Sequence, residues 1–221
     1  MQGLPIGYPM QHPVVGPHSV PVLPRIGVES LPTELIAFND LGRCNSPAQT
    51  GIQFFKDDIK FDGVLVQPFK YLDNFSKFKV IFTPDASITS GMSIMERRMN
   101  TVASRAVGAC YADRGLKVLV TLRWDSEQDY ELVSSGVPTH SVYGVSTVGV
   151  IRDDRRKREF LKGFDYFFHE LQPVGIAVFG NWLPELDQYL GLGVEIRNYV
   201  FDQHFGTPPK EKDAFGQIGL F

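Results

Sequence analysis

Short runs of apolar residues alternate with longer segments of helical periodicity along most of the chain. The runs are almost continuously apolar, as expected for strands that are buried on both faces in a parallel sheet. Helices between such strands supply the crossover connections that a parallel sheet requires. The predicted strands are IQFFKDD at 52–58, KVIFTPDAS at 79–87, KVLVTLRWD at 117–125, SVYGVSTVGV at 141–150, GIAVFGN at 175–181 and VEIRNYV at 194–200.

Two helices are especially clear in this pattern. One runs from Ser90 or Ser93 to Gly115 and the other from Asp153 to Leu171, because apolar residues recur in both at helical spacing. A Ser or an Asp stands where each helix needs an N-cap. Shorter helices are predicted at 33–38, 68–78 and 126–134.

The alternation predicts an α/β fold with about six β/α units around a parallel sheet, in a single domain over residues 31–205. We favour a small or incomplete β/α-barrel-like arrangement, because the Gly-rich first turn that marks a nucleotide-binding doubly wound sheet is absent. A doubly wound open sheet stays open as the alternative.

Residues 1–30 differ from the rest in their prolines, which recur every three or four positions and rule out a helix. This pattern predicts an extended, Pro-rich N-terminal arm that wraps the domain or reaches a neighbouring chain. A disordered tail is the alternative, although the valines, isoleucines and leucines between the prolines favour docking. Residues 206–221 are predicted to form a C-terminal tail.

Composition narrows the class of protein. The chain has 221 residues, of which 43% are hydrophobic, so it can bury a full core. A net charge of −3 gives no general attraction to nucleic acid. The chain has two cysteines, no secretion-signal pattern and no apolar run of about 18 residues, so we expect a cytoplasmic protein with no membrane partner. Zinc-ligand spacing, a P-loop and a serine-hydrolase elbow do not occur.

Polar residues follow the apolar part of each predicted strand, where the carboxyl ends of a parallel sheet form a common rim. Paired carboxylates can divide acid and base roles or bind a divalent metal such as Mg²⁺, so Asp58 and Asp85 are predicted catalytic residues. Arginine can bind a phosphate through two hydrogen bonds, and tryptophan can stack on a planar ligand. The predicted ligand-binding residues are Arg105, Arg123, Trp124, Asp125, Ser146, Thr147 and Asn181.

Several of these residues also have a purely structural interpretation. An Asp after a strand often caps the next helix, which fits Asp125, and Asp85 follows a proline in a turn-like sequence. Trp124 can equally be a core residue. Arg105 stands in a segment of small and apolar residues, ASRAVGA, which indicates a guanidinium held in place. Arg123 has no such explanation and is the strongest candidate.

Several segments in sequence order, including FTPDAS, the run from Asn100 to Leu132 and GVPTHSVYGVSTVGV, resemble a known family. They are similar to bacterial and phage proteins catalogued as domain of unknown function 4417, over about residues 50–182. The resemblance implies a phage or mobile-element setting, and hence the host cell cytoplasm, and it implies no particular activity. The resemblance also indicates that candidate site residues fall in motif segments, among them Asp58, Asp85, Arg105, Ser146 and Thr147.

Three functions follow as hypotheses. In the first, the rim binds or processes a phosphorylated, nucleotide-like small molecule. In the second, the protein is a nucleic-acid-processing or replication-associated phage protein that binds DNA through its arginine-bearing helices. In the third, the Pro-rich arm packs on a second copy of the chain and the protein serves assembly. Whether the protein is an enzyme, and whether it uses a metal, stays open.

Overall fold

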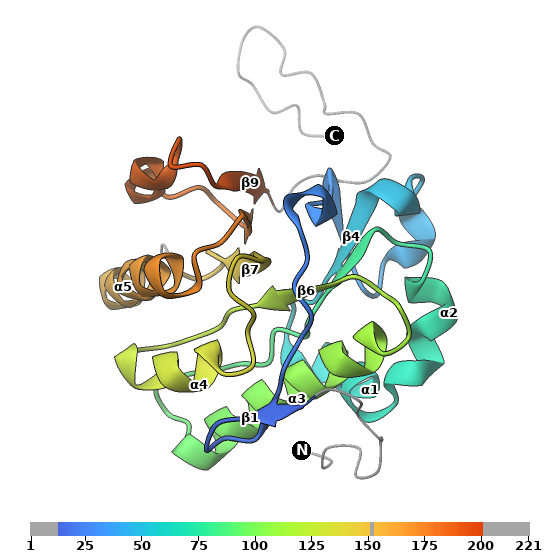
Figure 1. The fold of residues 1–221 in the computed structure, drawn as a ribbon, viewed down its shortest axis with the longest axis horizontal. Helices are drawn as coiled ribbons and strands as arrows, with labels where there is room; N and C mark the ends of the chain where they lie inside the picture. Colours follow the sequence, from blue (N-terminus) through green and yellow to red (C-terminus); the bar gives the residue numbers. More distant parts are fainter. Residues whose placement is uncertain (1–12, 151–152, 201–221) are drawn as a thin grey trace, which may run out of the picture.

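The computed structural model describes residues 13–150 and 153–200, and its main feature is a curved sheet of parallel strands (Figure 1). Seven strands pair in the order β3-β4-β5-β6-β7-β8-β9, so each strand lies beside the next one along the chain. They are β3 (Glu34–Ala37), β4 (Thr50–Gln53), β5 (Val80–Phe82), β6 (Val118–Thr121), β7 (Val142–Ser146), β8 (Gly175–Phe179) and β9 (Glu195–Tyr199).

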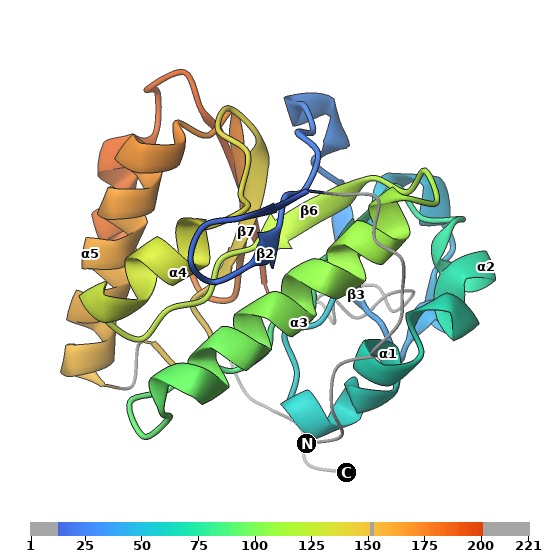
Figure 2. The same cartoon turned by 60° about the horizontal axis from the view of Figure 1, so that its bottom comes forward.

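This strand order confirms the prediction of a barrel-like α/β fold and shows that the doubly wound alternative is wrong. A doubly wound sheet reverses its strand order at a switch point, whereas here the order is sequential throughout, as in a β/α barrel. The sheet consequently curls toward closure, with the helices on its outer side (Figures 1 and 2).

The outer layer consists of helices of unequal length. They are α1 (Asp62–Val66), α2 (Leu72–Phe75), α3 (Ile94–Ala112), α4 (Tyr130–Ser134) and α5 (Asp154–Leu171). The 3-10 helices are η1 (Val28–Ser30), η2 (Leu41–Arg43), η3 (Pro47–Gln49), η4 (Asp58–Lys60), η5 (Pro68–Tyr71), η6 (Glu127–Asp129) and η7 (Pro184–Tyr189). The two long helices begin where the sequence predicts, because Ser93 caps α3 and Asp153 caps α5 with side-chain oxygens that accept backbone N–H groups.

The first strand of the barrel was predicted wrongly. Residues 34–37 form β3, where a short helix was expected, and this makes seven strands rather than about six. Leu35 and Ile36 pair in register with Gly51 and Ile52 of β4. So short a segment has little helical stability of its own, and pairing with β4 decides its conformation. The helix expected over 68–78 is likewise divided into η5 and α2.

Aromatic side chains fill the interior of the barrel. Phe55, just beyond β4, stacks on Phe179 of β8 with a ring-centroid distance of 4.9 Å and meets Phe82 of β5 edge-on at 5.8 Å. Because three strands separate β4 from β8 in the sheet, the first of these contacts crosses the interior. Gly144 leaves room for the rings, since a Cβ there would lie 2.6 Å from Phe82. The interior is therefore a packed core, as in other β/α barrels.

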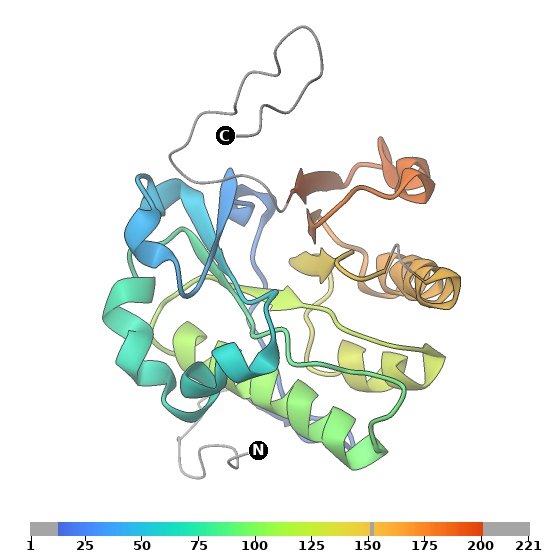
Figure 3. The same cartoon turned by 180° about the vertical axis from the view of Figure 1, so that it is seen from behind.

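Side chains close the seam between the first and the last strand. No backbone ladder joins β3 to β9 among the described residues. Arg197 of β9 donates from Nη1 to the carbonyl oxygens of Leu31 and Pro32 at 3.1 and 3.0 Å, and the Tyr199 hydroxyl donates to Pro32 at 2.6 Å. Figure 3 shows the fold from behind. The barrel is thus nearly closed, by side-chain hydrogen bonds to the segment before β3.

The residues before the barrel lie against it. The antiparallel strands β1 (Val14–Val15) and β2 (Val20–Pro21) form a small hairpin, and Val20, Leu23 and Ile26 are buried. The remainder of the predicted arm, residues 1–12, and the predicted tail at 206–221 lie outside the described residues. Over 13–150 and 153–200, no helix is long and apolar enough to span a bilayer.

Candidate functional site

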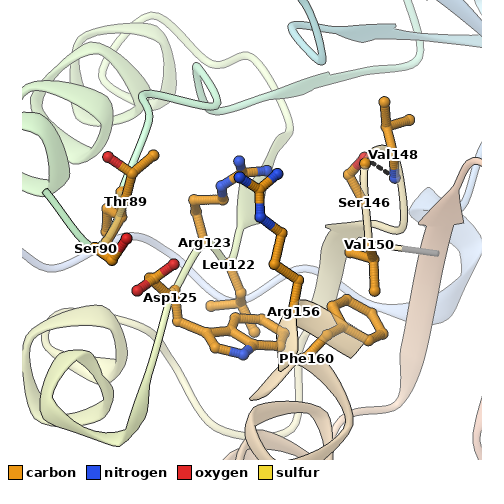
Figure 4. A pocket seen from close by; sticks show the side chains of 13 residues that line it. Thr89, Ser90, Leu122, Arg123, Asp125, Ser146, Val148, Val150, Arg156 and Phe160 are labelled. Atoms are coloured by element: carbon orange, nitrogen blue, oxygen red, sulfur yellow. Dashed lines mark hydrogen bonds between the residues drawn. The ribbon is translucent and has the colours of Figure 1, made fainter. Parts of the chain in front are cut away.

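Two adjoining hollows lie at the carboxyl ends of β4 to β7, and Figure 4 shows the smaller of the two. We call the larger one, of about 360 Å³, the rim cavity, and the smaller one, of about 120 Å³, the side pocket. They share Arg123, Ser146 and Val148. The rim cavity is also lined by Phe55, Lys56, Asp57, Lys60, Asp85 and Ser87. The side pocket is also lined by Ile88, Thr89, Ser90, Leu122, Trp124, Asp125, Gly149, Val150, Arg156 and Phe160.

An ion pair between Asp85 and Arg123 joins two neighbouring strand ends in the rim cavity. Arg123 Nη1 lies 3.5 Å from Asp85 Oδ2, and the two side chains are 34% and 9% exposed respectively. The other carboxylate oxygen, Oδ1, is buried without a hydrogen-bond partner among the described residues. Burial raises the pKa of Asp85, the charge of Arg123 opposes this rise, and the nearby Asp58 adds to it. The rim therefore holds a carboxyl group whose charged form is poorly stabilised.

Asp58, the second predicted catalytic residue, holds the loop that follows β5. Its Oδ2 accepts the backbone N–H of Ser87, and its Oδ1 accepts the Ser87 hydroxyl, both at 3.0 Å. The Ser87 carbonyl in turn accepts from Asn100 Nδ2 at 2.7 Å. Asp58 is near enough to Asp85 to affect its ionisation. Asp58 therefore positions the loop that carries Asp85. Ser87 and Asn100, which take part in the same hydrogen bonds, were not among the predicted site residues.

Arg105 does not reach the rim cavity or the side pocket. It is fully buried on α3, where its two Nη atoms donate to the carbonyl oxygens of Thr121 and Val133 at 3.1 and 3.2 Å. Burial lowers the pKa of Arg105 to about 10. The guanidinium is held, as the small residues around it indicated, and it ties α3 to β6 and α4.

Trp124 and Asp125 both line the side pocket, in different ways. The Trp124 indole N–H donates to the Glu159 carbonyl at 3.0 Å, and its ring stacks on Phe160 at a centroid distance of 5.3 Å, so the ring is packed under α5. The Asp125 carboxylate faces the pocket and lies 3.5 Å from Arg155. Asp125 is not a helix cap, because Ser126 is the N-cap of η6.

The predicted site residues at the carboxyl ends of β7 and β8 have two different roles: one lines the hollows, and two form a hydrogen bond between loops. Ser146 lines both hollows, and its Oγ accepts the Val148 N–H at 3.2 Å. Thr147 is buried, and its hydroxyl donates to the Asn181 carbonyl at 2.7 Å. Thr147 and Asn181 line neither hollow. Ser146 therefore lies at the site, whereas Thr147 and Asn181 hold the loops together.

A buried ion pair that was not predicted supports the side pocket. Arg97 Nη1 lies 2.6 Å from Asp129 Oδ1, and the side chains are only 4% and 2% exposed. Arg97 also donates from Nη2 to the Thr89 carbonyl at 2.7 Å, while Asp129 accepts the Asp125 N–H at 2.9 Å. The pair thus fixes two wall segments of the pocket against each other.

Few side chains at the rim could act as ligands for a metal ion. No group of three or more His, Cys, Asp or Glu side chains in residues 13–150 and 153–200 is arranged to hold one. Asp58 and Asp85 offer two carboxylates, and protein sites for Mg²⁺ often combine one or two carboxylates with phosphates of the ligand. Binding of Mg²⁺ together with a ligand therefore stays a prediction.

The chain is similar to curated phage proteins. The Gene 1 protein of Mycobacterium phage L5 is 25% identical over 168 residues, which span 72% of this chain and 73% of that protein. The Gene 1 protein of Mycobacterium phage D29 is also 25% identical over 168 residues, which span 72% of this chain and 62% of the relative. No solved structure gives a significant match.

The family resemblance extends further along the chain than residues 50–182. A sequence model of a family described as Domain of unknown function (DUF4417) matches residues 12–200. The match takes in the β1–β2 hairpin, the whole barrel from β3 to β9 and both hollows at its rim. The chain therefore belongs to this family.

Proposed function

We propose that the rim cavity binds a small phosphorylated, nucleotide-like molecule and that Arg123 pairs with its phosphate. The observation that carries this proposal is the ion pair of a partly exposed Arg123 with Asp85, whose second oxygen is buried without a partner in the part of the chain that the structure describes. Arginine binds phosphate through two parallel hydrogen bonds, and a site at the carboxyl ends of barrel strands is the common place for a ligand.

The charges around the rim cavity support an anionic ligand. Three basic residues line the cavity: Lys56, Lys60 and Arg123. The acidic residues in the same wall are Asp57, which pairs with Lys60 at 3.4 Å, and Asp85, whose ionisation burial disfavours. The balance of charge at the cavity is therefore positive when Asp85 is protonated, although the whole chain is slightly acidic.

Asp85 is the residue best placed for proton transfer. A carboxyl group whose pKa burial has raised holds its proton more readily than an ordinary Asp, so beside a bound ligand it can serve as a proton donor. Asp58 would act through Asp85, by holding the loop that carries it. Turnover of the ligand would make the protein an enzyme, and tight binding without turnover would make it a ligand-sequestering protein.

The phage origin of the curated relatives supports a phage or mobile-element setting, with the host cytoplasm as the expected location. The DNA-binding hypothesis gains less support from the structure. It relied on the arginine-bearing helices, and Arg155, Arg156 and Arg158 at the start of α5 are exposed. Of the α3 arginines, however, Arg97 and Arg105 are buried and bonded within the protein. They are not placed to neutralise DNA phosphates.

The proposal is tested with the full-length protein by native mass spectrometry for a co-purified ligand and by thermal shift. The panel consists of nucleotides, sugar phosphates and inorganic phosphate, with and without MgCl₂. A ligand at 100 times its Kd stabilises a protein by about 2.7 kcal/mol, which corresponds to about 5–10 °C for a chain of this size.

Arg123→Gln should abolish the shift, whereas the control Arg25→Gln should keep it, because Arg25 is exposed and lines neither hollow. Absence of both a co-purified ligand and any thermal shift would overturn the proposal. A shift that survives in Arg123→Gln would show that the phosphate binds elsewhere.

The assembly hypothesis stays a prediction, and its test is a truncation that spares the core. Removing residues 1–28 would delete the buried side chains of Val20, Leu23 and Ile26 and so unfold part of the core. Light scattering of a chain that lacks only residues 1–12 is the appropriate experiment. An unchanged oligomeric state would count against a role of the arm in assembly.

A further inference from the structure

We propose that the side pocket selects a guanine base and that Asp125 accepts hydrogen bonds from its N1–H and 2-amino groups. This inference rests on the proposed function, because it names the base of the nucleotide whose phosphate Arg123 holds. It concerns a different part of the site and different side chains from the phosphate contact.

The two hollows are arranged for a ligand with two parts. They meet at Arg123, Ser146 and Val148, so a molecule whose phosphate contacts Arg123 in the rim cavity can place its organic part in the side pocket. The rim cavity is lined largely by charged residues, whereas the side pocket combines an apolar wall with hydroxyl groups and a carboxylate. This division matches a nucleotide, which has an anionic end and a flat heterocyclic end.

The side pocket suits a planar ring in size and in lining. Its volume of about 120 Å³ is close to that of a ~150 Å³ protein cavity known to take up benzene, so it has room for one ring of a base, and the second ring would extend toward the adjoining rim cavity. Trp124 and Phe160 supply aromatic surface, and the aliphatic lining comes from Ile88, Leu122 and Val150. Figure 4 shows Phe160 and Val150 toward one side of the pocket and Asp125 near Ser90 toward the other. A base that enters between them would have its polar edge toward Asp125.

Asp125 has acceptor capacity to spare at this position. Its side chain is 14% exposed, and its carboxylate makes one polar contact among the described residues, at 3.5 Å to Arg155 Nη2. The Arg155 side chain is 46% exposed, so solvent weakens this ion pair. An ionised carboxylate can accept about four hydrogen bonds, so most of its acceptor sites are without a side-chain partner among the described residues.

The chemistry of a carboxylate discriminates between the bases. Guanine presents N1–H and the 2-amino group side by side, and a carboxylate can accept both. Adenine and cytosine have an acceptor nitrogen beside their amino group, and uracil has a carbonyl oxygen on each side of its N–H. Each of these bases would therefore place an acceptor against an acceptor oxygen of the carboxylate, which is unfavourable. The guanine O6 atom is an acceptor next to N1, and Arg156, which lines the same pocket, is a suitable donor to it.

The experiment measures binding of GMP, IMP, AMP, CMP, UMP and ribose 5-phosphate to the full-length protein by calorimetry. A bidentate contact to a base discriminates by about 1–3 kcal/mol, so AMP, CMP and UMP should bind about 10- to 100-fold more weakly than GMP. IMP lacks the 2-amino group and should lie between them. Asp125→Asn should remove the preference for GMP while ribose 5-phosphate binding stays within about twofold. The matched control Asp73→Asn, an exposed position on α2 that lines neither hollow, should change neither.

Each outcome bears on one of the two proposals. Equal binding of all the nucleotides, or a GMP preference that survives in Asp125→Asn, would overturn the assignment of Asp125 and leave the phosphate site standing. If neither the nucleotides nor ribose 5-phosphate binds, the proposed function fails, and the base assignment fails with it. Circular dichroism of Asp125→Asn confirms that the variant is folded before its binding is interpreted.

Discussion

The buried ion pair between Arg97 and Asp129 should be a major source of stability at the rim of the barrel. Arg97→Met would leave a nearly inaccessible carboxylate without its counter-charge, because both Asp129 oxygens lie within 2.8 Å of Arg97 Nη1. Removal of one partner of such a pair costs about 3–5 kcal/mol. The Thr89 and Met92 carbonyls would also lose the N–H groups that Arg97 donates to them. For a chain of this size the expected decrease in Tm is about 6–20 °C.

The measurement is urea unfolding followed by circular dichroism at pH 7. Arg98→Met is the matched control, because Arg98 is the next residue on the same helix and its side chain donates a hydrogen bond at 3.2 Å to the His18 carbonyl. This control should cost no more than about 1.5 kcal/mol. The double variant Arg97→Met/Asp129→Leu removes both charges and should be more stable than Arg97→Met alone. A cost below about 1 kcal/mol for Arg97→Met would refute this reasoning.

Three further predictions concern the barrel and its rim. Burial raises the pKa of Asp85 from 3.8, so its negative charge opposes folding at neutral pH; Asp85→Asn should raise the Tm at pH 7, and calorimetry should show this gain shrinking as the pH falls and vanishing below about 3.8. Gly144→Ala would place a Cβ 2.6 Å from Phe82 and should cost about 1–3 kcal/mol in urea unfolding. Tyr199→Phe removes the hydroxyl bonded to Pro32 and should cost about 0.5–1.5 kcal/mol by the same measurement.

Contrary results would be informative for each of these. An Asp85→Asn variant with the same Tm as the wild type at pH 7 would mean that Arg123 fully compensates the buried charge. A Gly144→Ala variant as stable as the wild type would mean that the Phe82 ring can move aside. If Tyr199→Phe leaves the free energy of unfolding unchanged, the hydrogen bonds of Arg197 alone stabilise the closed seam.

The apolar strands were predictable because burial on both faces leaves a continuous signature in the sequence, as at Val118–Thr121. The strand at Glu34–Ala37 was not, because the same four residues suit a short helix. Its conformation follows from pairing with Thr50–Gln53, 16 residues further along the chain. Contacts of this kind are invisible to local patterns.

The site was predictable in position and less so in detail. Asp85 and Arg123 each follow a buried strand, and the two side chains meet at the rim, as expected for a parallel sheet. The same reasoning selected Thr147, whose hydroxyl turns toward a backbone carbonyl. The use of both Asp58 oxygens by Ser87, 29 residues away, likewise depends on side-chain direction. A strand end specifies where along the rim a residue lies, and the tertiary structure decides where its side chain points.

The seam between β3 and β9 has a consequence for the order of folding. Every other strand pairs with its neighbour along the chain, whereas the hydrogen bonds of Arg197 and Tyr199 join residues 165 to 167 positions apart. Closing so long a loop costs more chain entropy than any other pairing in the barrel, so the seam should form after the rate-limiting step. Substitutions at the seam should then accelerate unfolding and leave the refolding rate almost unchanged. The seam is thus expected to be where the barrel first opens.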